Sequence, residues 1–145
     1  MAVTIEQIED ALSRTILGRV PKEVFILDGI IDVPTRRGVR YAIAMMRTDE
    51  NFAVFTPLSR LDSIFHEALH GGLFGFGILN LEPLSEIGGR ILAMKYQLFP
   101  GLPKRIVRYQ ECSCASHDEI LRRLKLQPAF QGVPQIRHYI LMEVV

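Results

Sequence analysis

The stretch that decides the fold runs from residue 56 to residue 72 and reads TPLSRLDSIFHEALHGG. Its apolar residues recur mainly at steps of three and four, which is the period of one helix face. They are Leu58, Leu61, Phe65, Ala68 and Leu69. Thr56 and Pro57 form a favourable N-cap and first-turn pair, and the two glycines at 71 and 72 favour a stop. We therefore predict a helix from about Thr56 to about His70.

Within that helix, His66 and His70 are four residues apart and project from the same face. Both imidazoles can therefore reach one tetrahedral metal ion, with Glu67 beside them. In such a site zinc lowers the pKa of a bound water to about 7, and a neighbouring carboxylate takes the proton as the water attacks a carbonyl. The spacing predicts a Zn²⁺ site at His66 and His70, with Glu67 as the catalytic base of peptide hydrolysis. Two surface histidines on an ordinary helix are the plainer alternative.

A second long helix is predicted from Glu82 or Pro83 to Pro100. The apolar residues expected on its buried face are Leu84, Ile87, Ile91, Leu92 and Leu98. Gly88 and Gly89 would each cost roughly 1 kcal/mol in a helix interior unless close packing needs them. We therefore expect the two helices to approach each other closely at these glycines.

A carboxylate from the following helix is a standard third ligand of an open catalytic zinc site. Glu86 is our candidate, whereas Glu82 is expected to act as a capping acid at the helix N-terminus. Glu82 and His117 remain the alternative third ligands. Arg90, one turn after Glu86, is expected either to orient that carboxylate or to form an i,i+4 surface pair with it.

The sequence leaves two supporting roles open. Asp62 lies one turn before His66, so it is either the hydrogen-bond acceptor of a ligand histidine or a solvated acid. A zinc peptidase also commonly needs a donor that stabilises the oxyanion of the tetrahedral intermediate. The candidates for that donor are Tyr96, Tyr109, His117 and His138, each of a type that is more often structural than catalytic.

The two cysteines, Cys112 and Cys114, are separated by one residue, a spacing that strains a mutual disulfide. With His117 they look like a fragment of a metal site that lacks a fourth ligand nearby. We interpret them as two ordinary thiols, and oxidising export is not indicated. If Cys112, Cys114 or His117 filled the fourth coordination position, a structural zinc site would be favoured over a catalytic one.

The two motifs together resemble the gluzincins, zinc peptidases with HExxH on one helix and a glutamate on the next. The segment EIGGRILAMKYQLFP, Glu86 to Pro100, looks like the second helix of the small ImmA/IrrE-type group, and the resemblance covers about residues 52 to 100. It implies His66, His70 and Glu86 as ligands and Glu67 as general base. The chain departs from the pattern in the short interval before Glu86 and in the Gly-Gly pair that follows.

The rest of the chain predicts an α+β domain. The expected elements are a helix over 4–17, a hairpin of strands over 23–33 and 39–46, a strand over 51–55, a loop over 73–81, a basic strand or loop over 104–109, a helix over 116–124 and a strand over 138–144. We predict one zincin-like minimal domain over residues 1–145, with an antiparallel sheet of three or four strands packed on the HExxH helix and the second ligand-bearing helix. The strand over 51–55 is our candidate for a sheet edge that binds an extended substrate.

The composition of the chain argues against some classes of binding partner. The chain of 145 residues has 48% hydrophobic and 23% charged residues and a net charge of +1, values typical of one globular domain without a field that attracts nucleic acid. No apolar stretch reaches the roughly 20 residues that span a bilayer, and the first twelve residues lack the basic start of a signal peptide. We expect a cytoplasmic peptidase that acts on a peptide or protein, with no nucleic-acid or membrane partner. The alternative is a zinc-binding regulatory or structural domain without turnover.

Overall fold

The computed structural model describes residues 3–29, 32–35, 38–41, 44–75, 82–113, 115–124 and 135–144. In chain order the elements are α1 (Ile5–Ser13), β1 (Glu23–Leu27), β2 (Asp32–Thr35), β3 (Gly38–Tyr41), β4 (Ala44–Arg47), β5 (Phe52–Phe55), α2 (Leu61–Gly75), α3 (Glu82–Leu98), β6 (Tyr109–Cys112), α4 (His117–Arg123) and β7 (Ile136–Leu141). The predicted α+β class is confirmed. No helix among the described residues is both long and apolar enough to cross a membrane.

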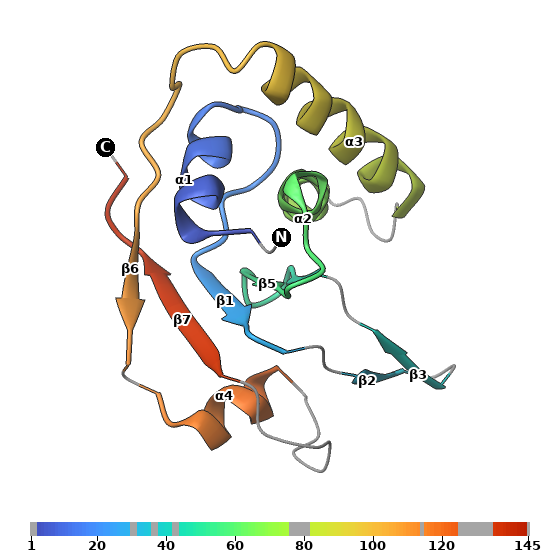
Figure 1. Ribbon diagram of the computed structural model, residues 1–145, viewed down its shortest axis with the longest axis vertical. Helices are drawn as coiled ribbons and strands as arrows, with labels where there is room; N and C mark the ends of the chain where they lie inside the picture. The colour runs from blue at the N-terminus through green and yellow to red at the C-terminus, as the bar shows by residue number, and fades with distance from the viewer. Residues whose placement is uncertain are drawn as a thin grey trace.

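The main sheet has five strands in the order β4-β5-β1-β7-β6. Figure 1 shows β5, β1, β7 and β6 of this sheet. β1 and β5 are parallel, and the other three pairs are antiparallel. The predicted antiparallel sheet of three or four strands is therefore wrong in the number of strands and in one of the four strand pairs. The segment expected as one strand over 39–46 divides into β3, which pairs with β2 in a separate hairpin, and β4, which pairs with β5. The chain therefore returns to the main sheet with β4, which runs opposite to β1, and then turns into β5, which runs parallel to β1.

The order of the strands also overturns the proposed sheet edge. β5 lies between β4 and β1, so the segment expected at the edge is internal, and β4 is the edge strand on that side. All four residues of β5 are buried. Alternate side chains of β1 and β5 enter two different cores, as a strand covered on both faces requires. The sequence pattern shows such a strand as a continuous apolar run and does not reveal its neighbours.

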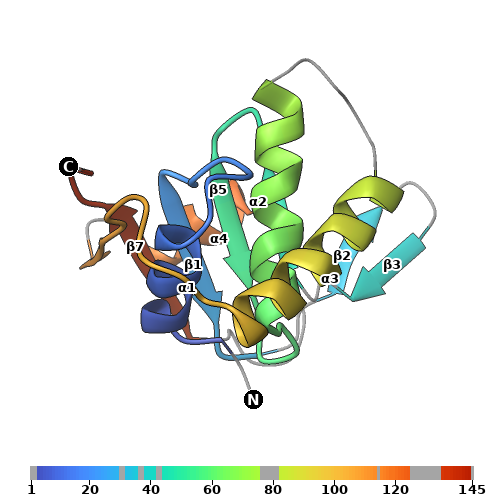
Figure 2. The ribbon, with the colours of Figure 1, turned by 90° about the horizontal axis from the view of Figure 1, so that it is seen from above.

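Helices cover both faces of the sheet. On one face, α1 and α2 pack over Val24, Ile26, Ala53 and Phe55 in the larger core. On the other, Ile120, Leu121 and Leu124, from α4 and the residue that ends it, pack over Phe25, Leu27, Phe52 and Val54. Figure 2 shows α2 between the sheet and α3, which forms an outer layer. The HExxH motif therefore lies on a helix held between the sheet and a second helix.

The helix α1 begins at the predicted N-cap. The Thr4 hydroxyl accepts from the Gln7 N–H, and the Gln7 side chain accepts from the Thr4 N–H, which makes a complete capping box. The helix ends at Ser13 rather than near Leu17. Gly18, predicted as the stop, instead has a φ of +87° and packs against the backbone of Ala68 in α2.

The motif helix begins later and ends later than predicted. Thr56 caps a turn, because its N–H donates to the Ser59 hydroxyl at 2.9 Å, and α2 starts only at Leu61. It then continues through both glycines to Gly75. A Cβ on Gly72 would lie 2.8 Å from the Cα of Gly18. These glycines therefore allow the chain after α1 to pack on α2, and they do not stop the helix.

The bounds of α3 agree with the prediction, but of the five apolar residues expected on its buried face only Leu92 is partly buried and packs against the core. Leu84, Ile87, Ile91 and Leu98 are 53–65% exposed. The buried residues are the small ones, Ser85, Gly89 and Ala93. The predicted close approach is confirmed, because a Cβ on Gly89 would lie 2.9 Å from the backbone nitrogen of His66. Contact through small residues holds α3 so near α2 that these four large apolar side chains remain outside.

Candidate metal centre

Three potential ligand atoms converge where α3 begins beside the middle of α2. Nε2 of His66 and Nε2 of His70 are 3.0 Å apart. The two carboxylate oxygens of Glu82 lie 2.9 Å from the first nitrogen and 2.8 Å from the second. The histidine side chains are only 14% and 22% exposed, whereas Glu82 is 68% exposed. These three residues, called the metal group below, lie close enough together to hold one metal ion.

The glutamate that completes this group is Glu82, which the sequence predicts as a capping acid of α3. Glu86 instead approaches Nδ1, the other ring nitrogen of His66, at 2.9 Å. Its second oxygen accepts from Arg90 at 2.8 Å, so Arg90 both forms the i,i+4 pair and orients the carboxylate. The sequence contains a pattern that makes Glu82 a candidate ligand as well as Glu86. Residues 82 and 86 are four apart, so both carboxylates share one helix face, as the two histidines do.

The second nitrogen of each ring has a neighbour of its own. Nδ1 of His66 faces Glu86, and Nδ1 of His70 lies 3.4 Å from the hydroxyl of the buried Ser85. A hydrogen bond at Nδ1 selects the tautomer and the ring orientation that leave Nε2 free to bind a metal. Asp62, the acceptor considered from sequence, pairs instead with Arg60 at 3.8 Å. The orienting groups therefore come from α3 and not from α2.

Glu67 is almost completely buried, at 6% exposure, between the two histidine positions. Burial raises its pKa to about 8, and the negative charge of Glu82 adds to the shift. Nevertheless Glu67 is among the residues that line the cleft in front of the metal group. A buried carboxylate at the wall of a cleft is typical of functional sites, because its burial costs free energy of folding and shifts its pKa.

The cleft has a volume of about 680 Å³. His66, Glu67, Glu82 and Glu86 form one wall, and the residues before and at the start of α2 form another. Ala44, the first residue of the edge strand β4, also lines it. The metal group therefore opens onto a space large enough for a small-molecule or peptide ligand, beside an edge of the sheet.

The tyrosines considered as oxyanion donors lie elsewhere. Tyr109 donates its hydroxyl hydrogen to the carbonyl of Pro21 at 2.7 Å, and burial raises its pKa. Tyr96 donates to Asp10, and burial together with that contact raises its pKa to about 12. Neither residue lines the cleft. The Tyr96 hydroxyl therefore ties α3 to α1, and the Tyr109 hydroxyl ties β6 to the segment before β1.

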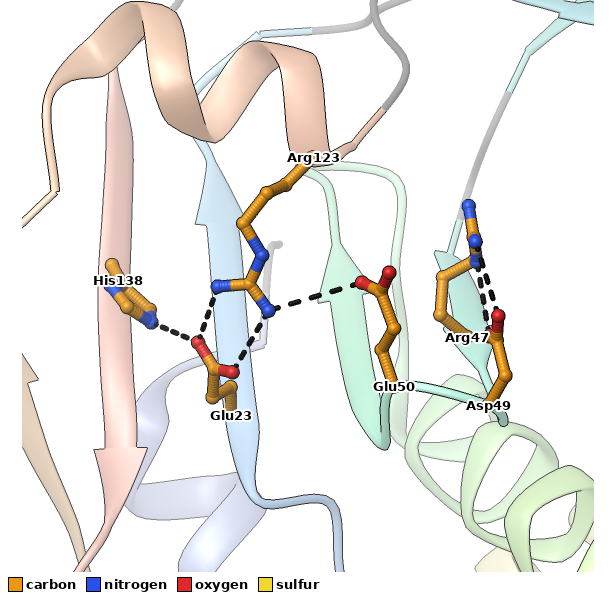
Figure 3. Close-up of polar contacts among 6 residues, drawn as sticks. All are labelled: Glu23, Arg47, Asp49, Glu50, Arg123 and His138. Atoms are coloured by element: carbon orange, nitrogen blue, oxygen red, sulfur yellow. Dashed lines mark hydrogen bonds and ion pairs between the residues drawn. The ribbon is translucent and has the colours of Figure 1, made fainter.

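His138 belongs to a polar network under α4 that the sequence did not indicate (Figure 3). Its Nε2 lies 2.7 Å from Glu23, whose carboxylate also accepts two hydrogen bonds from Arg123, each of 3.0 Å. The ring of His138 stacks on Phe25 with centroids 4.5 Å apart. Hydrogen bonds from Arg123, and to a smaller extent His138, hold the pKa of Glu23 below its usual value. This network joins α4, β1 and β7.

The segment Cys112 to His117 is also separate from the metal group. Cys112 is disulfide-bonded, so its interpretation as an ordinary thiol is wrong. The only other cysteine of the chain, Cys114, lies outside the described residues. Cys112 and His117 line a different hollow, together with His138. Neither residue lines the cleft of the metal group.

Comparison of the chain with protein-family models, with curated proteins and with solved structures finds no significant match. The function must therefore be inferred from the residues of this chain.

Proposed function

We propose that the chain is a zinc-dependent metallopeptidase. One observation carries the proposal: His66, His70 and Glu82 converge at the wall of an open cleft that the buried Glu67 also lines. Two imidazoles and one carboxylate form a donor set of catalytic zinc sites in which the fourth position is left to water or substrate. A closed structural site would need a fourth protein ligand.

The donor atoms fit a small divalent cation. Ligands about 2.1 Å from a tetrahedral ion lie roughly 3.4 Å from one another. The three separations here are 2.8–3.0 Å, so a slight opening of the group suffices. A zinc ion held there would supply Lewis acidity, which polarises a carbonyl and makes water more acidic. Glu86 and Ser85 would keep the two imidazoles in position from behind.

In this proposal Glu67 is the general base. Its neighbours in sequence place it next to the ligands, and burial has removed the water that would otherwise weaken its basicity. A cation bound by the adjacent residues would favour the ionised form of Glu67 and so offset the effect of burial. Glu67 would accept a proton from the attacking water and return it to the leaving amine.

The substrate would lie in extended form along β4. This strand pairs with β5 on one side and is the edge of the described sheet on the other. Its first residue lines the cleft, so a peptide added to the edge would pass in front of the metal group. Main-chain hydrogen bonds to an edge strand bind peptides of many sequences, with side-chain pockets providing the selectivity.

The test is a paired measurement of zinc content and hydrolysis of a broad peptide library. Wild type is expected to hold about one zinc ion per chain and to cleave peptides. Glu67→Gln is expected to keep the zinc and the fold but to lose 10²-fold to 10⁴-fold in rate, since it removes only the base. Glu6→Gln, an exposed glutamate of α1, is the matched control and should behave as wild type.

Two results would overturn the assignment. Wild type that binds zinc and cleaves nothing in the library would favour the zinc-binding domain without turnover. Cleavage by Glu67→Gln at the wild-type rate would remove the general base from the mechanism.

A further inference from the structure

The outer face of α3 carries a continuous apolar stripe. Its five members are Leu84, Ile87, Ile91, Met94 and Leu98, and each is 53–65% exposed. They follow one another at steps of three, four, three and four, the spacing of the a and d positions in a coiled-coil seam. The opposite face of α3 packs on α2 through small residues, so the stripe lies outside both cores formed by the described residues.

The size of the stripe is that of an interface. Five half-exposed large side chains, with the backbone at Gly88 and the stems of the flanking cations, offer on the order of 600–800 Å². Each partner in a standard protein interface contributes about 800 Å². Single exposed apolar residues are normal on a protein surface, whereas a contiguous patch of this size is not.

We propose that this stripe pairs with the same stripe of a second copy of the chain, with the two α3 helices antiparallel. A seam of a and d residues is self-complementary, so a second copy is a partner that buries it fully. Alignment of Ile91 with Met94 of the second copy also aligns Ile87 with Leu98 of the second copy. Phe99 and Leu102, 75% and 84% exposed just beyond the helix, then lie at the end that Leu84 of the second copy reaches.

The charges beside the stripe select the antiparallel orientation. In a parallel pair, Arg90 would face Lys95 of the second copy, and like charges across a seam repel. In the antiparallel alignment, Arg90 faces Gln97 and Lys95 faces Gly88 of the second copy, so no like charges meet. Antiparallel helices also place opposite ends of their dipoles side by side.

The oligomeric state of the full chain tests the proposal. Sedimentation velocity from about 1 µM to about 500 µM should show a concentration-dependent dimer, because a seam of two heptads binds weakly. Ile91→Glu should raise the dissociation constant at least tenfold, since it places a charge in the centre of the seam. Ile16→Glu, at a site 67% exposed outside α3, is the matched control and should leave the dimer unchanged. Circular dichroism verifies that both variants fold.

Cross-linking tests the orientation. Under mild oxidation, a mixture of Ile87→Cys and Leu98→Cys chains should form a mixed disulfide dimer, and each variant alone should form little. Wild-type protein treated in the same way shows how much cross-linking its native cysteines produce. A chain that is monomeric over the whole range, or a dimer that Ile91→Glu leaves intact, overturns the proposed surface. Efficient self-cross-linking of Ile91→Cys, with none in the mixture, overturns the antiparallel arrangement.

Discussion

The carboxylate of Glu86 lies 2.9 Å from Nδ1 of His66, on the side of the ring opposite the nitrogen that Glu82 contacts. One imidazole is thus held between two glutamates that are one helical turn apart on α3. A ring nitrogen that binds a metal is commonly oriented by a hydrogen bond at the other nitrogen. The geometry therefore favours Glu82 as the ligand and Glu86 as the residue that orients His66.

Replacement of Glu82 and replacement of Glu86 should affect zinc affinity to different extents. Glu82→Gln is expected to lose zinc at chelator concentrations that wild type withstands, because it removes a charged ligand. Glu86→Gln should retain zinc with affinity weakened about 10-fold to 100-fold, the usual effect of losing an orienting partner. Competition titration with a chromophoric chelator gives both values. The reverse ranking, with Glu86→Gln losing the metal and Glu82→Gln keeping it, would restore Glu86 as the third ligand.

The two adjacent glycines of α3 should respond differently to alanine. A Cβ on Gly89 would meet the backbone of His66 at 2.9 Å, whereas one on Gly88 would meet only the terminal Cδ1 of Leu69 at 2.8 Å. Gly89→Ala should therefore lower the free energy of unfolding by about 1–3 kcal/mol, because helix backbones must separate. Gly88→Ala should be close to neutral, since the flexible leucine can move and alanine gains up to about 1 kcal/mol of helix propensity. Urea denaturation of the two variants compares them directly, and equal effects would contradict the close approach of α2 and α3 at Gly89.

The polar contacts of Glu23 should make the stability of the fold depend on pH. The pKa of Glu23 is lower in the folded chain than its usual value of 4.5, chiefly because of Arg123. A depressed carboxylate pKa stabilises the fold above the unfolded value and ceases to do so as pH falls through the folded one. Glu23→Gln should therefore lower the free energy of unfolding by about 1–3 kcal/mol at about pH 7, and by much less at about pH 3.

Urea denaturation at both pH values measures this difference. Glu6→Gln, at an exposed position of α1, is the control and should follow wild type at each pH. A loss of stability in Glu23→Gln that is the same at both pH values would show that the charge of Glu23 contributes nothing, and that only its packing matters.

Proline substitutions in β4 test the substrate edge. In an edge strand, successive N–H groups point alternately to the neighbouring strand and away from the sheet. Of Met45→Pro and Met46→Pro, one should therefore break a bond to β5 and lose stability. The other should keep its stability and zinc while KM for a cleaved peptide rises about tenfold, because the outward N–H can no longer donate to the substrate. Alanine at each position controls for the lost side chain. Unchanged KM in the stable proline variant would exclude strand addition at β4.

Some of the site follows from the sequence alone because it depends only on helix geometry. The spacing of His66 and His70 places both rings on one face whatever surrounds the helix, since 3.6 residues make a turn. The Gly88-Gly89 pair likewise indicated a close helix contact, because glycine inside a helix has a cost that packing must offset. These inferences use neighbours in the chain and need no knowledge of the fold.

The rest depended on how distant segments meet. Glu82 and Glu86 share one face of α3, so only the depth at which α3 crosses α2 decides which carboxylate reaches Nε2 and which reaches Nδ1. The same crossing, set by the contact at Gly89, leaves Ile87 and Ile91 outside although their spacing resembles that of a buried face. The predicted edge strand is internal for a related reason: an apolar run specifies that a strand is buried, but the path of the whole chain decides which strands lie beside it. Helix periodicity alone determined that the two histidines share one face, and tertiary packing decided which glutamate of α3 contacts which ring nitrogen.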